Sequence, residues 1–290
     1  MSDLKRVEVR GANLAYREEG NGTQHVVLVH ANLSDLRSWE AILPLLARSH
    51  HVVSYTTRYA WPNEPIQAAN IDSWDEQAED LAELIKKLEI QPCHLVGNST
   101  GATLALMVAQ RYPDLVSTLF LEEPPVVTLF LPRTPPTIID IITLLWRYPW
   151  AFMSTMKYGI FTIASTEASW KAGKDEEGLQ TFLRGVVGTE SYRKLTETRI
   201  EQARINMGPH KALFCNGSLP SITEADVKAI ATISYLFTAE KTPGAQKCIN
   251  TLLVCLMPNA EEVHFKGVSH FLHEDDPVSV AQAIMGRIES

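Results

Sequence analysis

The sequence predicts an α/β protein in which helices cover both faces of a mostly parallel β-sheet and a helical cap is inserted late in the chain. Three observations support this. Strand-like and helix-like segments alternate as far as Leu121, which is the pattern of repeated β-α-β units. The strand-like segments are almost continuously apolar, as expected for strands buried on both faces. After Pro124 the composition changes to a proline-punctuated segment rich in Trp, Phe and Met, and strand-like segments return only at Ile233.

The individual elements follow from local patterns. The chain opens with a predicted edge hairpin, because apolar and polar residues alternate over Arg6–Arg10 and Asn13–Arg17 around a glycine. Strands and helices are then expected in turn at Val26–His30, Asp35–Arg48, His51–Tyr55, Ile71–Leu88, Gln91–Val96, Ala102–Ala109 and Val116–Leu121. The later sheet elements are expected to be strands Ile233–Phe237 and Glu262–Phe265 and helix Pro277–Ile288.

These elements divide the chain into a core and a cap. Residues 1–124 and 219–290 are expected to form the α/β core. Residues 125–218, which show helical patterns and no strand pattern, are expected to form a cap. We place that cap over the carboxyl edge of the sheet, because ligands of such folds bind there.

The composition excludes several classes of function. The 290 residues are 45% hydrophobic, so the chain can bury a large core without a metal or a disulfide. A net charge of -8 argues against nucleic acid or an anionic membrane as the main partner. The four cysteines lack a C-x-x-C spacing and no secretory leader pattern is present, so we expect a cytoplasmic protein with free thiols. No apolar run is long enough for a membrane span, and no metal set or nucleotide motif is present, so no metal and no cofactor are expected.

The segment Gly97-Asn98-Ser99-Thr100-Gly101 predicts a nucleophilic serine. It lies between an apolar strand-like run and an apolar helix-like run. A serine on such a tight strand-to-helix turn has its hydroxyl pushed into the open, and small residues are needed on either side because the two backbones come close together. A G-x-S-x-G pattern alone is weak, but this context favours Ser99 as the nucleophile.

A serine hydroxyl needs a neighbouring base to become nucleophilic at neutral pH. We expect that base to be His270, which lies in a loop between the last predicted strand and the last predicted helix. His273, three residues further on, is the alternative, and we expect it on the solvated side. The other histidines are expected to be strand residues (His30, His94, His264) or exposed residues (His25, His50, His51, His210).

By these residues the chain resembles the α/β-hydrolase superfamily over nearly its whole length. The resemblance rests on the serine turn, on the order of serine before histidine, and on the strand-loop pair His30-Ala31-Asn32. It implies an eight-stranded sheet, a cap, and an oxyanion hole formed by the backbone N–H groups of Thr100 and Asn32. Relatives have glycine where this chain has Ala31, a change that narrows the backbone conformations of the loop.

The resemblance leaves the acid of the triad open. Relatives usually carry it after the strand that ends near Phe237, where this chain has Thr242, which cannot stabilise an imidazolium. Glu123 and Glu240 are the two main substitutes, and Glu122 is a third. We favour Glu123, because the chain resembles the subset of the superfamily, including some haloalkane dehalogenases, whose acid follows the earlier strand.

A serine at the turn predicts acyl chemistry, since halide displacement and epoxide opening on this scaffold need an aspartate there. We expect transfer of an acyl group from an ester, lactone or thioester to Ser99, with His270 as general base. Two alternatives stay open: a lyase or cyclase of an apolar, polyketide-like metabolite of secondary metabolism, and a small-molecule receptor without turnover.

The cap is expected to select the substrate. Its large apolar side chains predict a chamber for a small, largely apolar molecule, although at least half of them are expected to pack the cap onto the sheet. The residues expected to line it are Trp146, Trp150, Phe152, Met153 and Phe161. Both a monomer and a homodimer are compatible with the sequence.

Overall fold

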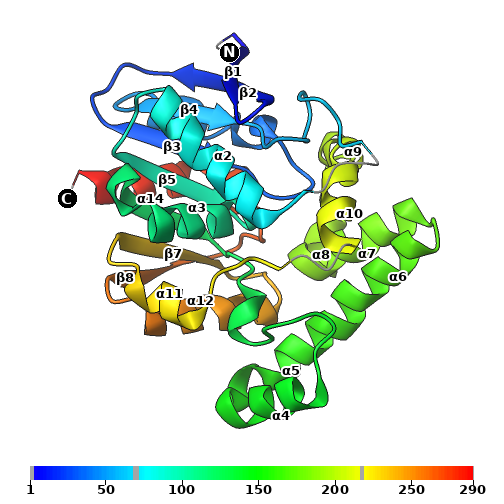
Figure 1. The fold of residues 1–290 in the computed structure, drawn as a ribbon. Helices are drawn as coiled ribbons and strands as arrows, with labels where there is room; N and C mark the ends of the chain where they lie inside the picture. Colours follow the sequence, from blue (N-terminus) through cyan, green and yellow to red (C-terminus); the bar gives the residue numbers. More distant parts are fainter. Residues whose placement is uncertain (1–2, 68–71, 216–218, 290) are drawn as a thin grey trace.

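The computed structural model describes residues 3–67, 72–215 and 219–289. Its centre is an eight-stranded sheet with the order β1-β2-β4-β3-β5-β6-β7-β8 (Figure 1). The β1–β2 and β2–β4 pairs are antiparallel and all other neighbours are parallel, which confirms the predicted sheet. The strands are β1 (Lys5–Val9), β2 (Ala12–Glu19), β3 (His25–Val29), β4 (His51–Tyr55), β5 (Cys93–Asn98), β6 (Val116–Glu122), β7 (Ile233–Ala239) and β8 (Ala260–Phe265).

Helices cover both faces of this sheet. The helices of the core are η1 (Leu36–Trp39), α1 (Leu43–Leu46), α2 (Trp74–Lys87), α3 (Thr100–Arg111), η2 (Pro113–Leu115), α11 (Glu224–Ala229), α12 (Gly244–Leu256), α13 (Leu272–Asp275) and α14 (Pro277–Ile288). Alternate side chains of one strand enter two separate cores. Val27 and Val29 pack with α2, α3 and α12, whereas Val26 and Leu28 pack with α1 and α14. The sheet is therefore buried on both sides, as its apolar strands predict.

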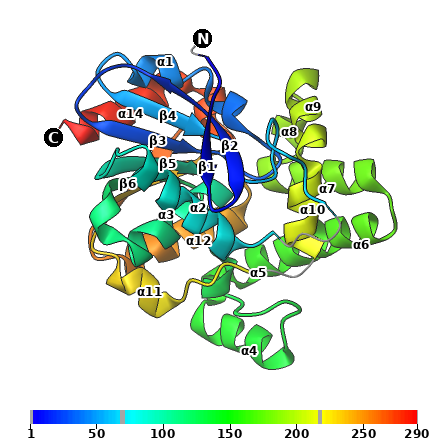
Figure 2. The ribbon, with the colours of Figure 1, turned by 45° about the horizontal axis from the view of Figure 1, so that its top comes forward.

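The chain between β6 and β7 is helical where the structure describes it. Its elements are η3 (Val127–Leu129), α4 (Ile138–Arg147), α5 (Pro149–Tyr158), the π-helical turn η4 (Gly159–Ala164), α6 (Ser165–Lys171), α7 (Asp175–Val187), α8 (Thr189–Tyr192), α9 (Glu197–Ile205) and α10 (Met207–Cys215). Figure 2 shows α6 to α10 to one side of the sheet. No helix of the described ranges is both long and apolar enough to cross a bilayer. The end of the predicted cap, residues 216–218, lies outside the described residues.

Two predicted helices have different bounds. The segment Asp35–Arg48 forms two short helices, η1 and α1, instead of one. Pro44 explains the break, because it has no N–H and its ring excludes the carbonyl of the preceding turn. The helix predicted from Ile71 begins at Trp74 after Ser73, whose side chain accepts a hydrogen bond from the N–H of Glu76. Ile71 itself lies outside the described residues.

Candidate active site

Ser99 occupies the sharp turn between β5 and α3 that its flanking glycines predict. Its backbone is strained, with φ 51° and ψ -117°, and its side chain is partly exposed between two buried segments. A Cβ atom on Gly97 would lie 2.5 Å from the nitrogen of Ala102, and one on Gly101 would lie 2.1 Å from the carbonyl oxygen of Val29. Both glycines are thus required by close backbone approach, and the serine hydroxyl is held at the carboxyl edge of the sheet.

His270 and Glu123 form a buried pair beside this turn. The Nδ1 atom of His270 lies 2.6 Å from a carboxylate oxygen of Glu123, and the two side chains are 2% and 0% exposed. The same carboxylate accepts hydrogen bonds from the Thr242 hydroxyl (2.8 Å) and from the backbone N–H of Ala239 (2.9 Å). A carboxylate only accepts hydrogen bonds, so the neutral imidazole carries its proton on Nδ1 and leaves the lone pair of Nε2 free.

The strand pairing brings the serine, the histidine and the glutamate together. Asn98 and Glu122 are register partners on β5 and β6, so Ser99 and Glu123 directly follow paired residues. The N–H of Ser99 donates to the carbonyl of Glu122 (2.7 Å), and the Asn98 side chain donates to the carbonyl of His270 (3.0 Å). No hydrogen bond joins the Ser99 hydroxyl to His270 within the described residues.

Three of the residues around the site have an unusual backbone. Leu33, Ser99 and Glu123, which follow β3, β5 and β6, have φ values of 57°, 51° and 49°. Each such non-glycine residue costs about 1–3 kcal/mol, and strain of this kind clusters at functional sites. The sequence gives no direct sign of it at Leu33 or Glu123, because neither residue is a glycine.

Among the described residues, the backbone N–H groups of the two predicted oxyanion donors, Thr100 and Asn32, donate no loop or cap hydrogen bond. Thr100 begins α3, so its N–H has no acceptor within the helix. His30 orients the other loop: its Nε2 accepts from the N–H of Thr57 (3.0 Å) and its Nδ1 then donates to the carbonyl of Ala31 (2.7 Å). Because C=O and N–H point in opposite directions in a trans peptide, the N–H of Asn32 points away from His30. Burial lowers the pKa of His30 and so favours this neutral form.

A second histidine–glutamate pair lies next to the first. His273 was expected to be solvated, but it is 1% exposed and its Nδ1 lies 2.7 Å from the carboxylate of Glu122. Its ring stacks on Trp39 with centroids 3.7 Å apart. The Asn98 side chain also donates to Glu122 (3.1 Å), so it joins this pair to the backbone of His270. Asn98 is a site residue that sequence reasoning missed, although it precedes the predicted nucleophile.

Two other histidines also differ from expectation. His50 and His210 were expected to be exposed, but they are 1% and 3% exposed. The Nδ1 atom of His50 forms a hydrogen bond with the Ser49 hydroxyl (2.8 Å). His210 lies among the rings of Trp170, Phe182 and Phe214 in the cap. The expectation failed for His210 because Trp170 and Phe182 come from other helices, α6 and α7, which the residues next to His210 do not indicate.

Glu240 lies apart from His270. It is exposed, and its carboxylate accepts from the backbone N–H of Gly267 (2.7 Å). Of the three glutamates considered for the acid, only Glu123 contacts His270 within the described residues. Thr242, which stands where relatives carry their acid, instead hydrogen-bonds to Glu123. The position at which the resemblance would place the acid therefore contacts Glu123.

The cap is tied to the loop that follows β3. Arg199 on α9 donates to the carbonyl of Leu33 (3.0 Å) and to the Glu274 carboxylate (3.1 Å). Asn206 donates to Asp35 (2.7 Å). Burial raises the pKa of Asp35, but hydrogen bonds from Arg37 and Asn206 outweigh it and hold that pKa below its ordinary value. The loop beside the site is therefore fixed by ionic and polar contacts with the cap.

The apolar cap residues predicted to line a substrate chamber mostly face outward. Trp146, Trp150, Met153 and Phe161 are 84%, 51%, 59% and 71% exposed, and only Phe152 is partly buried against the core. The structure therefore does not place the first four around a closed chamber. The sequence shows that these residues are apolar, but it does not show whether each one lies on the side of its helix that faces the core or on the side that faces solvent.

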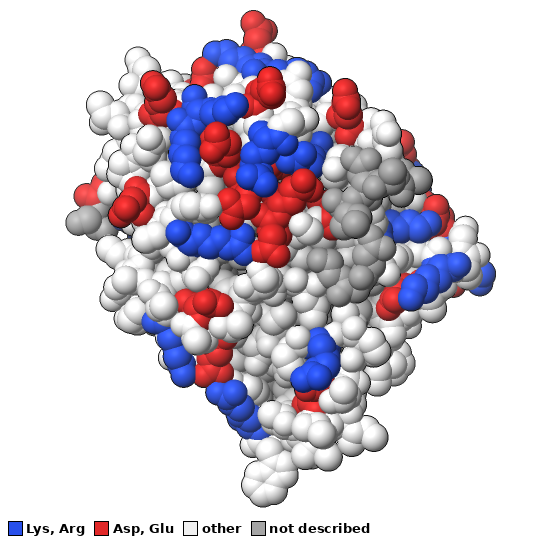
Figure 3. Space-filling view, viewed as in Figure 1, with Lys and Arg blue, Asp and Glu red and all other residues white. Residues whose placement is uncertain are grey.

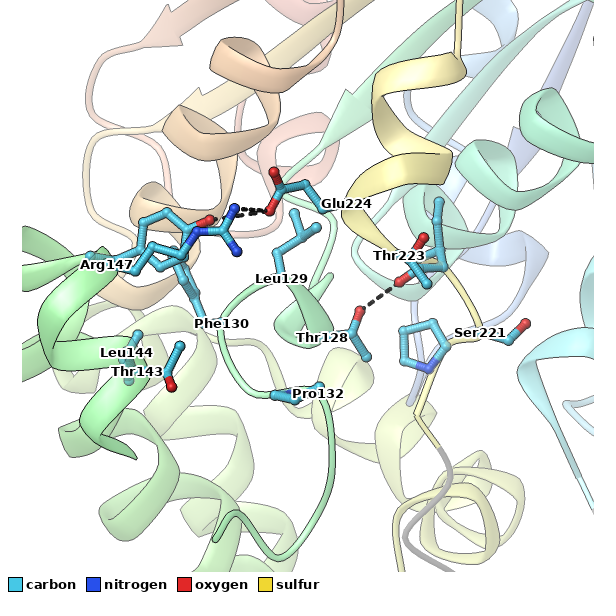
Figure 4. A pocket seen from close by; sticks show the side chains of 13 residues that line it. Thr128, Leu129, Phe130, Pro132, Thr143, Leu144, Arg147, Ser221, Thr223 and Glu224 are labelled. Atoms are coloured by element: carbon cyan, nitrogen blue, oxygen red, sulfur yellow. Dashed lines mark hydrogen bonds and ion pairs between the residues drawn. The ribbon is translucent and has the colours of Figure 1, made fainter. Parts of the chain in front are cut away.

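A pocket lies at the base of the cap. It has a volume of about 490 Å³ and lies between α4 and the segment that leads into α11 (Figure 4). Its lining includes Leu129, Phe130 and Leu144 with the Arg147–Glu224 ion pair. No group of His, Cys, Asp or Glu residues in the described ranges is arranged to hold a metal ion.

Comparisons with known proteins agree with this architecture. A family model for the alpha/beta hydrolase fold matches residues 24–277. Strigolactone esterase RMS3 of Pisum sativum is 29% identical over 107 residues, which are 36% of this chain and 40% of that protein. Karrikin insensitive 2 receptor B of Petunia hybrida is 31% identical over 104 residues, which are 35% of this chain and 38% of that protein. The match spans about two fifths of the length of these curated relatives.

A solved structure matches the whole fold. Est816, described as an N-acyl homoserine lactone degrading enzyme, aligns with a TM-score of 0.73 over 97% of this chain and 99% of that chain. The two sequences are only 18% identical, so this likeness bears on the fold and not on the substrate.

Proposed function

The chain belongs to the alpha/beta hydrolase family, and on that premise we propose that it is a serine hydrolase that cleaves an ester, lactone or thioester bond of a small, largely apolar metabolite. The observation that carries this proposal is the buried pair of His270 and Glu123, with 2.6 Å between imidazole and carboxylate, beside the strained turn that displays Ser99. A nucleophile, a base and an acid are thus all supplied by this chain's own side chains.

The proposed reaction has two halves. In the first, Ser99 Oγ attacks the substrate carbonyl carbon while its proton passes to Nε2 of His270. The oxyanion accepts hydrogen bonds from the N–H groups of Thr100 and Asn32, and such donors each contribute about 3–4 kcal/mol to lowering the barrier. The bond from the carbonyl carbon to the leaving oxygen or sulfur then breaks, and His270 returns the proton to that atom.

In the second half, water releases the acyl group. His270 takes a proton from water as the hydroxide attacks the acyl carbon, and the proton then passes to Ser99 Oγ as the acyl bond breaks. Glu123 stabilises the imidazolium in both halves. With a lactone the leaving oxygen stays attached to the acyl group, so a single hydroxy acid is released.

Labelling by a fluorophosphonate probe tests the activated serine. Wild-type protein should react within minutes, and Ser99→Ala should not react. Ser117→Ala, which changes an exposed serine at the start of β6, is the matched control and should react like the wild type. Slow labelling of the wild type, equal to that of denatured protein, would contradict the proposal.

A panel of esters and lactones of graded acyl length, run in H₂¹⁸O, tests the hydrolysis. One heavy oxygen should enter the product carboxylate. Turnover without heavy oxygen would favour the cyclase or lyase alternative. Ligand binding without turnover would favour a receptor. Karrikin insensitive 2 receptor B, which matches part of this chain, is named as a receptor.

A further inference from the structure

The part of the cap that projects from the molecule carries a dense row of exposed apolar side chains. Within 24 residues of α4, α5 and η4, nine large apolar residues are between 47% and 84% exposed: Ile138, Ile139, Ile142, Leu145, Trp146, Trp150, Met153, Ile160 and Phe161. We call these nine the cap-tip surface. In Figure 3 the corresponding lower end of the molecule is almost free of charged atoms. Monomeric proteins rarely expose a surface of this kind without a partner for it.

The spacing of these residues shows that they form stripes rather than a scatter. On α4, Ile138, Ile142 and Leu145 recur at helical spacing, with Ile139 and Trp146 beside them. On the continuous helix formed by α5 and η4, Trp150, Met153 and Ile160 follow the same spacing. Two adjacent helices therefore each present an apolar stripe to solvent.

The opposite sides of these helices are already packed. Leu144, Tyr148 and Ala151 are buried against the core, and Arg147 forms an ion pair with Glu224 at the start of α11. Turning the stripes inward would expose these buried residues and break that ion pair. The cap-tip surface therefore needs a cover from outside the chain rather than a closing movement of the cap.

The area of the surface suits a second copy of this chain. Nine side chains of this size, between 47% and 84% exposed, present on the order of 1,000 Å². A stable dimer buries about 800 Å² on each partner. Interface cores are rich in Trp, Phe, Met and Arg and poor in acidic residues. Asp140 is the one carboxylate between Pro132 and Thr166, and it is 7% exposed and paired with Arg133 (3.2 Å).

The charges do not favour a lipid surface. Surface-bound helices carry many Lys and Arg residues, and recognition of anionic lipid takes a cluster of about four to eight of them. The same stretch has three: Arg133, Arg147 and Lys157. Two of these are neutralised by Asp140 and Glu224. We therefore propose that the cap-tip surface is the interface of a two-fold symmetric homodimer, in which α4 of one protomer packs against α4 of its partner.

The mass in solution tests this, by light scattering or sedimentation at several protein concentrations. Wild-type protein should have twice the 32.3 kDa mass of one chain. The double variant Ile142→Glu, Trp146→Glu should be monomeric, with a dissociation constant raised at least about 100-fold, because buried anchors of this kind dominate interfaces. Val278→Glu, a change at an exposed apolar residue on α14, is the matched control and should stay dimeric.

Two measurements keep the test decisive if the double variant folds poorly. Hydrogen exchange of the unchanged protein should show that protection over residues 138–147 falls on dilution. Flotation with vesicles of phosphatidylcholine and phosphatidylserine should leave the protein unbound. A wild-type monomer at all concentrations, a dimer that survives the double substitution, or vesicle binding that the double substitution abolishes would each overturn the proposal.

Discussion

Two glutamates next to each other at the end of β6 bind two histidines that are three residues apart, and we propose a catalytic role for only one of the two pairs. Glu123 binds His270 and Glu122 binds His273, with Nδ1-to-oxygen distances of 2.6 and 2.7 Å. The Nε2 of His273 is buried without a partner among the described residues, against Trp39. No hydrogen bond to the Nε2 of His270 is present within the described residues either, but this atom is not one of the fully buried unpaired atoms. The two pairs thus differ in the burial of the free nitrogen.

Exchanging each histidine for glutamine should give the largest difference between the pairs. His270→Gln removes the proposed base and should lower kcat/KM about 10⁴- to 10⁶-fold, as the loss of a triad histidine does in serine hydrolases. His273→Gln should keep kcat/KM within about tenfold, because its imidazole contacts Glu122 and Trp39 and is given no contact with the substrate in the proposed reaction. The measurement is hydrolysis of the best ester or lactone of the panel. Equal losses in the two variants would show that the pairs are not distinct.

Exchanging each glutamate for glutamine also distinguishes the two pairs, with a smaller expected loss of activity than for the histidines. Glu123→Gln should lower kcat about 10³- to 10⁴-fold, because the amide can favour the wrong imidazole tautomer and cannot stabilise the imidazolium. Glu122→Gln should mainly lower the free energy of unfolding, by about 1–3 kcal/mol, since it weakens a buried charged hydrogen bond.

Glu240→Gln is the matched control for these glutamates, and it should change neither kcat nor stability, since Glu240 is exposed. Steady-state kinetics and urea titrations of the three variants give both quantities. If Glu240→Gln alone were inactive, Glu123 would not be the acid.

The sequence predicts the serine turn and the sheet better than it predicts the two histidine–glutamate pairs, for a physical reason. Ser99 was predictable because a turn this tight needs glycines at 97 and 101, and such a need leaves a mark in the residue types. The sheet was predictable because its buried strands are continuously apolar. Glu122 and Glu123 look alike in sequence, but they contact different histidines, and the backbone of Glu123 is strained, with φ 49°. The exposure of the apolar residues on α4 and α5 could not be predicted for a similar reason. The spacing of apolar residues in a helix does not indicate which other surface covers them.

Acidification should give the smallest effect, and it depends on His210, a buried histidine without a carboxylate partner among the described residues. Burial among aromatic rings lowers the pKa of His210 to about 3, and its two ring nitrogens have no partner within the described residues. In the unfolded chain its pKa is near 6.5, so the unfolded state binds the extra proton first. The stability that depends on neutral His210 is therefore full above pH 6.5 and is lost as the pH falls below it, by about 1.4 kcal/mol per unit.

Between pH 7 and pH 5 this histidine should therefore cost about 2 kcal/mol of unfolding free energy. His210→Phe removes the titrating group and should reduce the loss by that amount, whatever its effect at pH 7. Urea titrations of both proteins at the two pH values measure the difference. His94, whose pKa burial lowers to about 4, titrates in both proteins and cancels. An identical pH dependence in the two proteins would mean that His210 can gain a proton in the folded cap. In that case the burial of His210 among aromatic rings would not be enough to keep its imidazole neutral in the folded protein.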